Sequence, residues 1–326
     1  MSGKQPAQKD KKFYYRRAKW ENQGKLTIEK LLVDAHQQLD TVGKRSFSVG
    51  SGAEVRGADF KDNGGLYLQI ASYVPGEATS IIDKSKKARR SDISAQSAPE
   101  GKDYLDGEVF VYVKDNHVIL CPSGVRENVV QVYILHVLRA VKKEGIAETF
   151  ELDKVAKTNK LRMIREEGVK EIDLDTSLYE ASLLHIDKQN PKISSLKKVI
   201  TEQLLAVFGK DKDLKEIKEK ENLNLRVSLR YDGSEARKHM KEAEFGQAGK
   251  KRLEKTAEQV ISEFEEDHEN GFVIVTGQGN RITSDEIRVS DTFRVKTLGK
   301  SLSKPEAWVK LKAYHDRLKS DGVFEQ

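Results

Sequence analysis

Cysteine is nearly absent from this sequence: a single cysteine occurs among 326 residues. A disulfide within the chain is therefore excluded, and so is a zinc site built from cysteines. Cys121 follows the apolar residues 118–120, and an isolated cysteine in such a run is typically a small buried hydrophobe. Because no activating base or helix start adjoins it, we do not expect a catalytic thiol.

Long apolar runs are also missing. No stretch approaches the ~20 apolar residues that a membrane-spanning helix needs. The first 12 residues are polar and rich in lysine, unlike a signal peptide. Hydrophobic residues nevertheless make up 37% of the chain and charged residues 34%, which is typical of a globular protein with a highly charged surface. We therefore expect a soluble, cytoplasmic protein.

Motifs for metal, nucleotide or base recognition are absent as well. The seven histidines never occur at the i, i+4 spacing with a third ligand that indicates zinc. Residues 277–281, Gly-Gln-Gly-Asn-Arg, lack the lysine and the hydroxyl residue of a phosphate-binding P-loop, and we interpret them as a strand turn. No helix-turn-helix, zinc-finger or RNA-recognition pattern occurs. The sequence therefore predicts no cofactor.

A length of 326 residues is typical of two domains, because one hydrophobic core stops growing at about 250–300 residues. Residues 210–221 are almost all charged, and the boundary is expected within them. The prediction is an α+β protein whose two domains, residues 1–215 and 216–326, each contain an antiparallel sheet flanked by helices. A sub-boundary is expected near residue 145.

Hydrophobic periodicity and turn residues predict the elements of both domains. Thr27 is placed to cap an amphipathic helix, and Lys114-Asp-Asn marks the turn of a hairpin. Residues 83–106 show no apolar periodicity and are predicted to form a long loop. Strands are expected at residues 13–18, 46–49, 53–60, 66–73, 108–113, 117–121, 150–155, 169–174, 223–230, 272–276, 286–289 and 293–298. Helices are expected at residues 28–39, 127–143, 159–167, 194–208, about 234–268 and 303–321.

Basic residues gather in clusters that contain few acids. The chain has 58 basic and 52 acidic residues, a net charge of +6, so the clustering is more informative than the total. Since no base-reading scaffold accompanies these clusters, we expect them to bind the phosphate backbone of duplex DNA without sequence preference. The residues expected to contact phosphates are Arg226, Arg230, Arg237, Lys238, Lys241, Lys250, Lys251 and Arg252, with Lys86, Lys87, Arg89 and Arg90 as a second, mobile contact.

Two other functions remain open from the residues alone. Asp173 and Asp175 lie two residues apart on one strand face, where carboxylates can hold Mg²⁺ in a nuclease. Alternatively, the basic faces can bind an acidic protein, as in a sensor or toxin subunit that does not bind DNA. If the protein is a nuclease, it should nick a supercoiled plasmid in the presence of Mg²⁺. If it binds only an acidic protein, it should leave the gel mobility of duplex DNA unaltered.

Several segments of the chain carry a likeness to a known family. They are Phe13-Tyr-Tyr-Arg-Arg with the helix ending at residues 31–36, the lysine-serine residues 83–86, the hairpin segments 109–113 and 118–120, and the final helix ending at residues 314–321. In this pattern, which covers most of its length, the chain resembles the RexA-like phage exclusion proteins of phage lambda and its prophage relatives.

The resemblance implies a homodimer of two-domain chains with a fold related to the DNA-encircling nucleoid protein RdgC. It also implies sequence-independent DNA binding, action with a membrane-protein partner, and a role in phage defence or superinfection exclusion, without enzymatic chemistry. Dimerisation is expected on physical grounds too, since a two-fold pair doubles the basic track along a duplex. Trp308 on the last helix is expected to anchor the core or the dimer rather than stack on bases.

Overall fold

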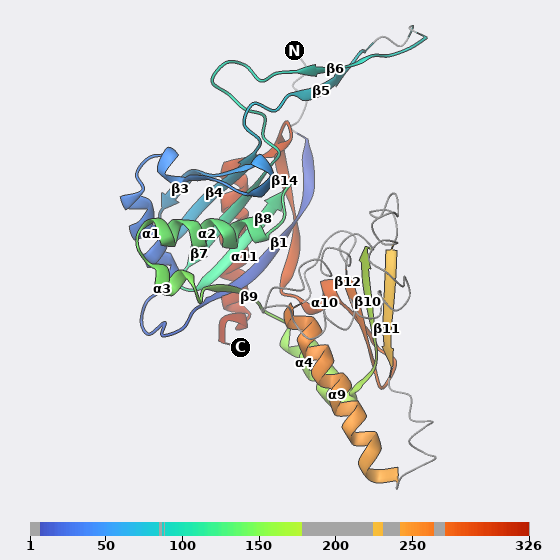
Figure 1. Ribbon diagram of the computed structural model, residues 1–326. Helices are drawn as coiled ribbons and strands as arrows, with labels where there is room; N and C mark the ends of the chain where they lie inside the picture. The colour runs from blue at the N-terminus through green and yellow to red at the C-terminus, as the bar shows by residue number, and fades with distance from the viewer. Residues whose placement is uncertain are drawn as a thin grey trace. The chain divides into compact units, whose positions relative to one another are not determined.

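The structure, a computed structural model, describes residues 7–84, 87, 89–177, 224–230, 242–263 and 271–325 (Figure 1). The chain forms two compact units. Unit 1 consists of Met1–Val155 and Ser290–Gln326, and unit 2 consists of Ala156–Val289. Antiparallel sheets and helices occur in both units, which confirms the predicted α+β class.

Unit 1 is built around a nine-stranded sheet. Its strand order is β15-β14-β1-β8-β7-β4-β3-β2, and β9 pairs with β1 beside this path. All of these pairings are antiparallel. The strands are β1 Gln8–Lys19, β2 Ser46–Ser48, β3 Glu54–Asp62, β4 Leu66–Tyr73, β7 Gly107–Lys114, β8 His117–Ser123, β9 Glu151–Lys154, β14 Ser290–Leu298 and β15 Ser301–Leu302.

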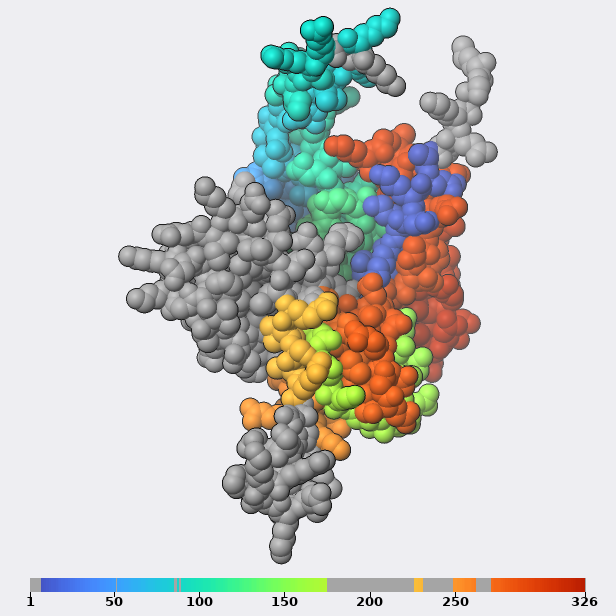
Figure 2. Space-filling model, turned by 90° about the vertical axis from the view of Figure 1, so that its right-hand side faces the viewer, coloured from blue at the N-terminus to red at the C-terminus, as the bar shows by residue number. Residues whose placement is uncertain are grey.

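Strand β1, near the N-terminus, pairs with strand β14 from the C-terminal part of the chain. One of its edges pairs with β8, and its other edge pairs with β14 and then with β9. Figure 2 shows β1 in blue beside the orange-red C-terminal segment. Because the backbone of an interior strand needs partners on both edges, the segment from β14 to α11 completes unit 1. The structure thus divides the chain differently from the predicted domains 1–215 and 216–326, and residues 210–221 lie outside the described residues.

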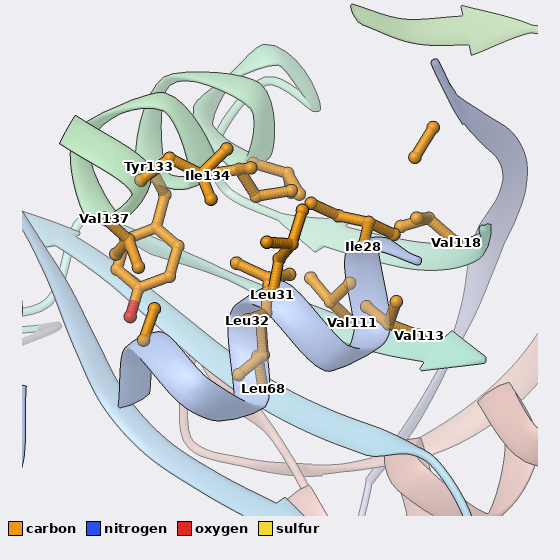
Figure 3. Close-up of a cluster of buried hydrophobic side chains, with 14 of the residues drawn as sticks. Ile28, Leu31, Leu32, Leu68, Val111, Val113, Val118, Tyr133, Ile134 and Val137 are labelled. Atoms are coloured by element: carbon orange, nitrogen blue, oxygen red, sulfur yellow. The ribbon is translucent and has the colours of Figure 1, made fainter. Parts of the chain in front are cut away.

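Two helices cover one face of this sheet. α1 (Ile28–Gln38) and α2 (Asn128–Ala140) direct Leu32 and Val137 into a core with Val111 of β7 (Figure 3). Each such side chain contributes about 1.5–3 kcal/mol by leaving water. The short helix α3 (Glu144–Ala147) and the 3-10 turns at Gly43–Arg45, Gly50–Gly52 and Val323–Glu325 complete the helical elements described for unit 1, apart from α11.

α11 (Lys304–Ser320) covers the other face. Tyr112 follows Val111 in β7 and therefore points away from α1, and its ring centroid lies 5.1 Å from that of His315 on α11. Phe13 of β1 contacts Tyr314 of α11 edge to face, with ring centroids 6.5 Å apart. Both faces of the sheet are thus buried at β7, which explains why this strand is apolar almost throughout.

A buried histidine joins α1 to α2. His36 Nδ1 lies 2.7 Å from the Leu32 carbonyl oxygen, and its Nε2 lies 2.9 Å from the Tyr133 hydroxyl. A neutral imidazole with its proton on Nδ1 satisfies both contacts. Burial lowers the pKa of His36 to about 4, so the ring is neutral at physiological pH. The same hydroxyl occupies the space of a side chain at Gly57, where an added Cβ would lie 2.0 Å from it.

Unit 2 contains a four-stranded antiparallel sheet with the order β11-β10-β12-β13. On one face, Ile172 and Ile274 of the sheet form a core with Leu253 and Ala257 of α9 and with Ile164 of α4. The described elements are α4 Thr158–Glu167, β10 Val169–Ser177, β11 Asn224–Arg230, α9 Glu242–Glu263, β12 Gly271–Thr276, β13 Arg281–Thr283 and α10 Ser284–Ile287. The predicted helix at residues 194–208 lies outside the described residues.

The predicted strand at residues 286–289 is wrong. Ser284–Ile287 form the short helix α10, which begins with a capping box. The Thr283 hydroxyl accepts a hydrogen bond from the Glu286 N–H at 3.3 Å, and the Glu286 carboxylate accepts one from the Thr283 N–H at 3.2 Å. These two reciprocal bonds outweigh the strand preference of the isoleucine and valine that follow.

Candidate nucleic-acid interface

An arm of unit 1, residues 74–106, carries the first predicted basic cluster. β4 and β7 pair directly, with Ser72 opposite Gly107, and the residues between them project as a separate ribbon (Figures 1 and 2). In the arm, β5 (Thr79–Ile82) and β6 (Ile93–Gln96) pair antiparallel. The prediction of a loop over residues 83–106 is therefore wrong for Ile93–Gln96, which form β6. A strand of four residues is too short to show a recognisable hydrophobic periodicity.

The arm tip, residues 83–92, is exposed throughout its described part. At the base of the tip, the backbone N–H of Asp83 donates to the Asp92 carbonyl oxygen at 3.4 Å and closes the ribbon. Within the residues that the structure describes, the basic side chains of the tip form no ion pair. An anion can therefore approach them without displacing any acidic side chain that the structure describes. These cations are Lys84, Lys87, Arg89 and Arg90, while Lys86 lies outside the described residues.

A second cluster lies on α9. Leu253 and Ala257 are buried against the sheet and fix the rotation of the helix. Lys251 and Lys255, one turn apart, lie on the opposite, exposed side. Over the described residues, this cluster also forms no ion pair. Its exposed cations are Lys250, Lys251, Arg252 and Lys255.

The basic surface of α9 ends one turn further along. Glu258 faces Arg165 of α4 with a nitrogen-to-oxygen distance of 3.7 Å, and both side chains are largely exposed. The charge of the helix changes sign here, since Glu258 and Glu263 follow without another basic residue. The remaining predicted cations before α9, Arg237, Lys238 and Lys241, lie outside the described residues.

A third cluster lies on β11, opposite a row of carboxylates. The side chains that alternate with Val227 and Leu229 are exposed on one face of the sheet, as the spacing of Arg226 and Arg230 predicts. In the strand register, Arg226, Ser228 and Arg230 are the partners of Asp175, Asp173 and Glu171 of β10.

Arg230 is bound within this row. Its Nε donates to Glu171 Oε1 at 2.6 Å, and the Ser228 hydroxyl donates to the same oxygen at 2.7 Å. Hydrogen bonds from Ser228 and Arg230 lower the pKa of Glu171, so its carboxylate stays charged. The sheet face thus sets an acid beside each predicted phosphate-binding arginine, and its local charge nearly cancels. Of the three clusters, this one is the least suited to a phosphate.

The carboxylates proposed for a nuclease do not gather into a site in the part of the chain that the structure describes. Asp173 lies on β10 between Glu171 and Asp175, and Glu171 is occupied by Ser228 and Arg230. No group of three or more His, Cys, Asp or Glu side chains among the described residues can hold a metal ion. The side chain of Asp175 lies outside the described residues.

Two other residues singled out by the sequence are built into unit 1. Cys121 is buried, and burial raises the pKa of its thiol to about 12. Trp308 is half-buried: its Nε1 donates to the Leu68 carbonyl oxygen at 3.4 Å, and its ring centroid lies 5.6 Å from that of Tyr67. These contacts place the indole against the sheet and leave little of its face for a base.

Sequence reasoning missed the apolar residues of the arm. Ile82 and Ile93 are 64% and 71% exposed, and Ile81 is 44% exposed. Two short runs with β-favouring isoleucines, Ser-Ile-Ile and Ile-Ser-Ala, flank the basic turn at residues 83–92. This arrangement of strand, turn and strand was the available signal for a ribbon.

No protein-family model matches the chain, and no curated protein is significantly similar to it. Within the described residues, the helices are all too short or too polar to cross a membrane.

Proposed function

We propose that this protein binds duplex DNA without sequence preference, through phosphate contacts made by the arm tip and the exposed face of α9. The observation that carries the proposal is the arm tip, where exposed cations project on a thin ribbon and form no ion pair with the described residues. The side chains we assign to phosphate are Lys87, Arg89 and Arg90 of the tip, and Lys250, Lys251 and Arg252 of α9.

The physical basis is the release of counterions. Duplex DNA carries a condensed layer of cations, and each Lys or Arg that neutralises a phosphate releases one of them. A cation that already has an internal partner must give up that bond first, so the gain is smaller. For this reason we rank Arg230, which is bound to Glu171, below the arm and α9. We rank Arg226, whose strand partner is Asp175, with it.

The biological role that we propose is phage defence or superinfection exclusion, as in the RexA-like proteins that the sequence resembles. Within this role the chain acts as a homodimer and signals to a membrane-protein effector, without chemistry of its own. The resemblance of residues 13–17, 109–113 and 314–321 supports this part of the proposal. The charge of the arm supports the DNA-binding part independently.

Fluorescence anisotropy with labelled duplexes tests the proposal. If about six phosphates are neutralised, the logarithm of the affinity should fall with the logarithm of the salt concentration at a slope of about −5. Duplexes of equal length and different sequence should bind equally. A flat salt response, or strong preference for one duplex, contradicts the proposal. Nicking of a supercoiled plasmid in Mg²⁺ would instead support a nuclease, and unaltered duplex mobility at low salt would support a protein-binding role.

A further inference from the structure

The arm displays an apolar pair that the fold of unit 1 does not use. Ile82 and Ile93 are cross-strand partners in the β5–β6 ribbon, so their side chains lie on the same face. They are 64% and 71% exposed, whereas the isoleucines in the core of unit 1 are fully buried. The pair sits directly below the arm tip, one residue from the hydrogen bond between Asp83 and Asp92.

A partner that covers the exposed isoleucines would stabilise this two-stranded ribbon. Isolated ribbons are marginally stable in water, and burial of exposed β-branched side chains is favourable. A second copy of the chain is a poor candidate for this partner. A stable protein interface buries about 800 Å² on each side, far more than the side chains of Ile81, Ile82 and Ile93 provide.

The charge beside the pair indicates the partner. Residues 83–92 contain five basic and two acidic residues. The side chains of the described cations at the tip are exposed, so a polyanion can lie along the turn while the isoleucines reach past its backbone. Duplex DNA offers both features, because phosphates border its grooves and apolar base faces become accessible where a step is unstacked.

We infer that the arm enters the minor groove and that Ile82 and Ile93 wedge into a base step, unstacking it and bending the duplex. This inference rests on the proposed DNA binding and adds a deformation to it. Isoleucine is one of the side chains that proteins insert between base pairs for this purpose, and such wedges bend DNA by about 20–90°. The tip cations contact the phosphates on either side of the opened groove. Flexible steps such as TA and CA are the cheapest to open, so they are the preferred points of insertion.

Resonance energy transfer between fluorophores at the two ends of a short duplex tests the wedge. The wild-type chain should shorten the distance between the ends, and the variant Ile82→Thr with Ile93→Thr should not. Threonine keeps the β-branched shape that favours the ribbon and removes the apolar tip. The variant should still bind, with the same salt dependence and about three- to tenfold lower affinity, because its phosphate contacts are unchanged.

The matched control is Val309→Thr, which changes an equally exposed apolar residue on α11 of unit 1. It should bend DNA like the wild type. Thermal unfolding should be the same for all three proteins, since none of the substituted side chains is buried. Wild-type protein that binds the duplex without bending it, or a threonine variant that bends it fully, overturns the wedge but leaves DNA binding intact. Failure of the wild type to bind at all overturns the proposed function itself.

Discussion

The arm tip and the exposed face of β11 look alike in the sequence and differ in the structure. Both place arginines at close spacing, with no acid between Lys84 and Arg90 of the tip or within β11. In the fold, β10 brings a carboxylate opposite each arginine of β11, and Arg230 is bound to Glu171. Among the described residues, the ribbon that carries the arm tip consists of β5 and β6 alone, and Arg89 and Arg90 form no ion pair. The charge that a partner meets is thus set by the strand register as much as by the sequence.

Charge reversal at the arm tip should have the largest effect on DNA binding. The triple variant Lys87→Glu, Arg89→Glu, Arg90→Glu removes three attractive contacts and adds three repulsive ones. We expect a loss of about 100-fold in affinity at low salt and a salt slope reduced by about 3. The measurement is anisotropy of a labelled duplex over a series of salt concentrations.

A charge-matched control separates the site from the net charge. Lys25→Glu, Lys30→Glu and Lys143→Glu change three exposed lysines of unit 1 outside the arm, with the same change in net charge. This control should lose much less affinity than the tip variant. Equal losses in the two proteins would show that long-range charge, rather than the arm, carries the binding.

Acid should affect the body of unit 1 and spare the arm. His36 has a pKa of about 4 in the fold, lowered mainly by burial and also by the nearby charge of Arg45, against an ordinary value of 6.5. Between these values the unfolded chain binds a proton that the folded chain does not, so stability falls as the pH drops from about 6.5 to about 4. The whole difference between the two pKa values corresponds to roughly 3 kcal/mol of stability. Denaturant unfolding at pH 7 and pH 5 measures the part that develops above pH 5, roughly 2 kcal/mol.

The replacement His36→Gln serves as the control for this effect. This variant should have a lower free energy of unfolding at pH 7 than the wild type. It should also lack part of the pH dependence of stability that the wild type shows. Burial lowers the pKa of His117 to about 4 as well, so the slope should be reduced rather than abolished. DNA affinity measured on folded protein should be the same at both pH values, since the tip cations stay charged. A wild-type stability that is constant from pH 7 to pH 5 would contradict the neutral state of His36.

Removing the acid beside Arg230 should make β11 more like the arm. Glu171→Gln keeps the size and the hydrogen bond from Ser228 and releases the arginine charge. We expect the affinity for duplex DNA to rise by about threefold, because the released Arg230 would contribute roughly half of one additional phosphate contact. A competition assay between wild type and variant on one labelled duplex resolves a change of this size. Lower affinity in the variant would mean that Glu171 positions Arg230 for DNA.

The smallest change is expected for Arg230→Gln. Its charge is already balanced by Glu171, so DNA affinity should fall by no more than about twofold. The thermal midpoint should hardly move, because the Arg230 side chain is largely exposed and Glu171 keeps its hydrogen bond from Ser228. A loss as large as that of the tip variant would reverse the ranking of the two regions.

Local signals predicted the elements that depend on neighbours in sequence. Thr27 caps α1 through a hydrogen bond to the Lys30 N–H, as its position before an apolar periodicity predicts. The hairpin of β7 and β8 follows from two apolar runs around a short turn. The apolar face predicted for residues 127–143 is the buried face of α2. Each of these features is decided within about 15 residues, where periodicity and capping are reliable.

Features that depend on distant residues were not predicted. The placement of β14 beside β1 needs the pairing of two chain ends, and neither strand identifies its partner in its own sequence. The carboxylates facing Arg226 and Arg230 come from β10, about 50 residues away, so the compensation of charge was not visible. The helix α10 depends on two hydrogen bonds between Thr283 and Glu286 that outweigh residue preference. For the candidate site, the sequence identified the cations but not which of them were already partnered.

The pairing of β1 with β14 also means that β1 is synthesised long before its partner strand. Asp10 and Arg294, 284 residues apart in the chain, form an ion pair across these strands. At a translation rate of about 5–20 residues per second, β1 leaves the ribosome roughly 15–60 s before its partner exists. Throughout that interval the edge of β1 that later pairs with β14 is bare, and a bare edge can pair with another chain. The whole of unit 2 is synthesised in the meantime. A ribosome that stalls anywhere between β9 and β14 therefore releases a chain with an open sheet, however well the rest has folded.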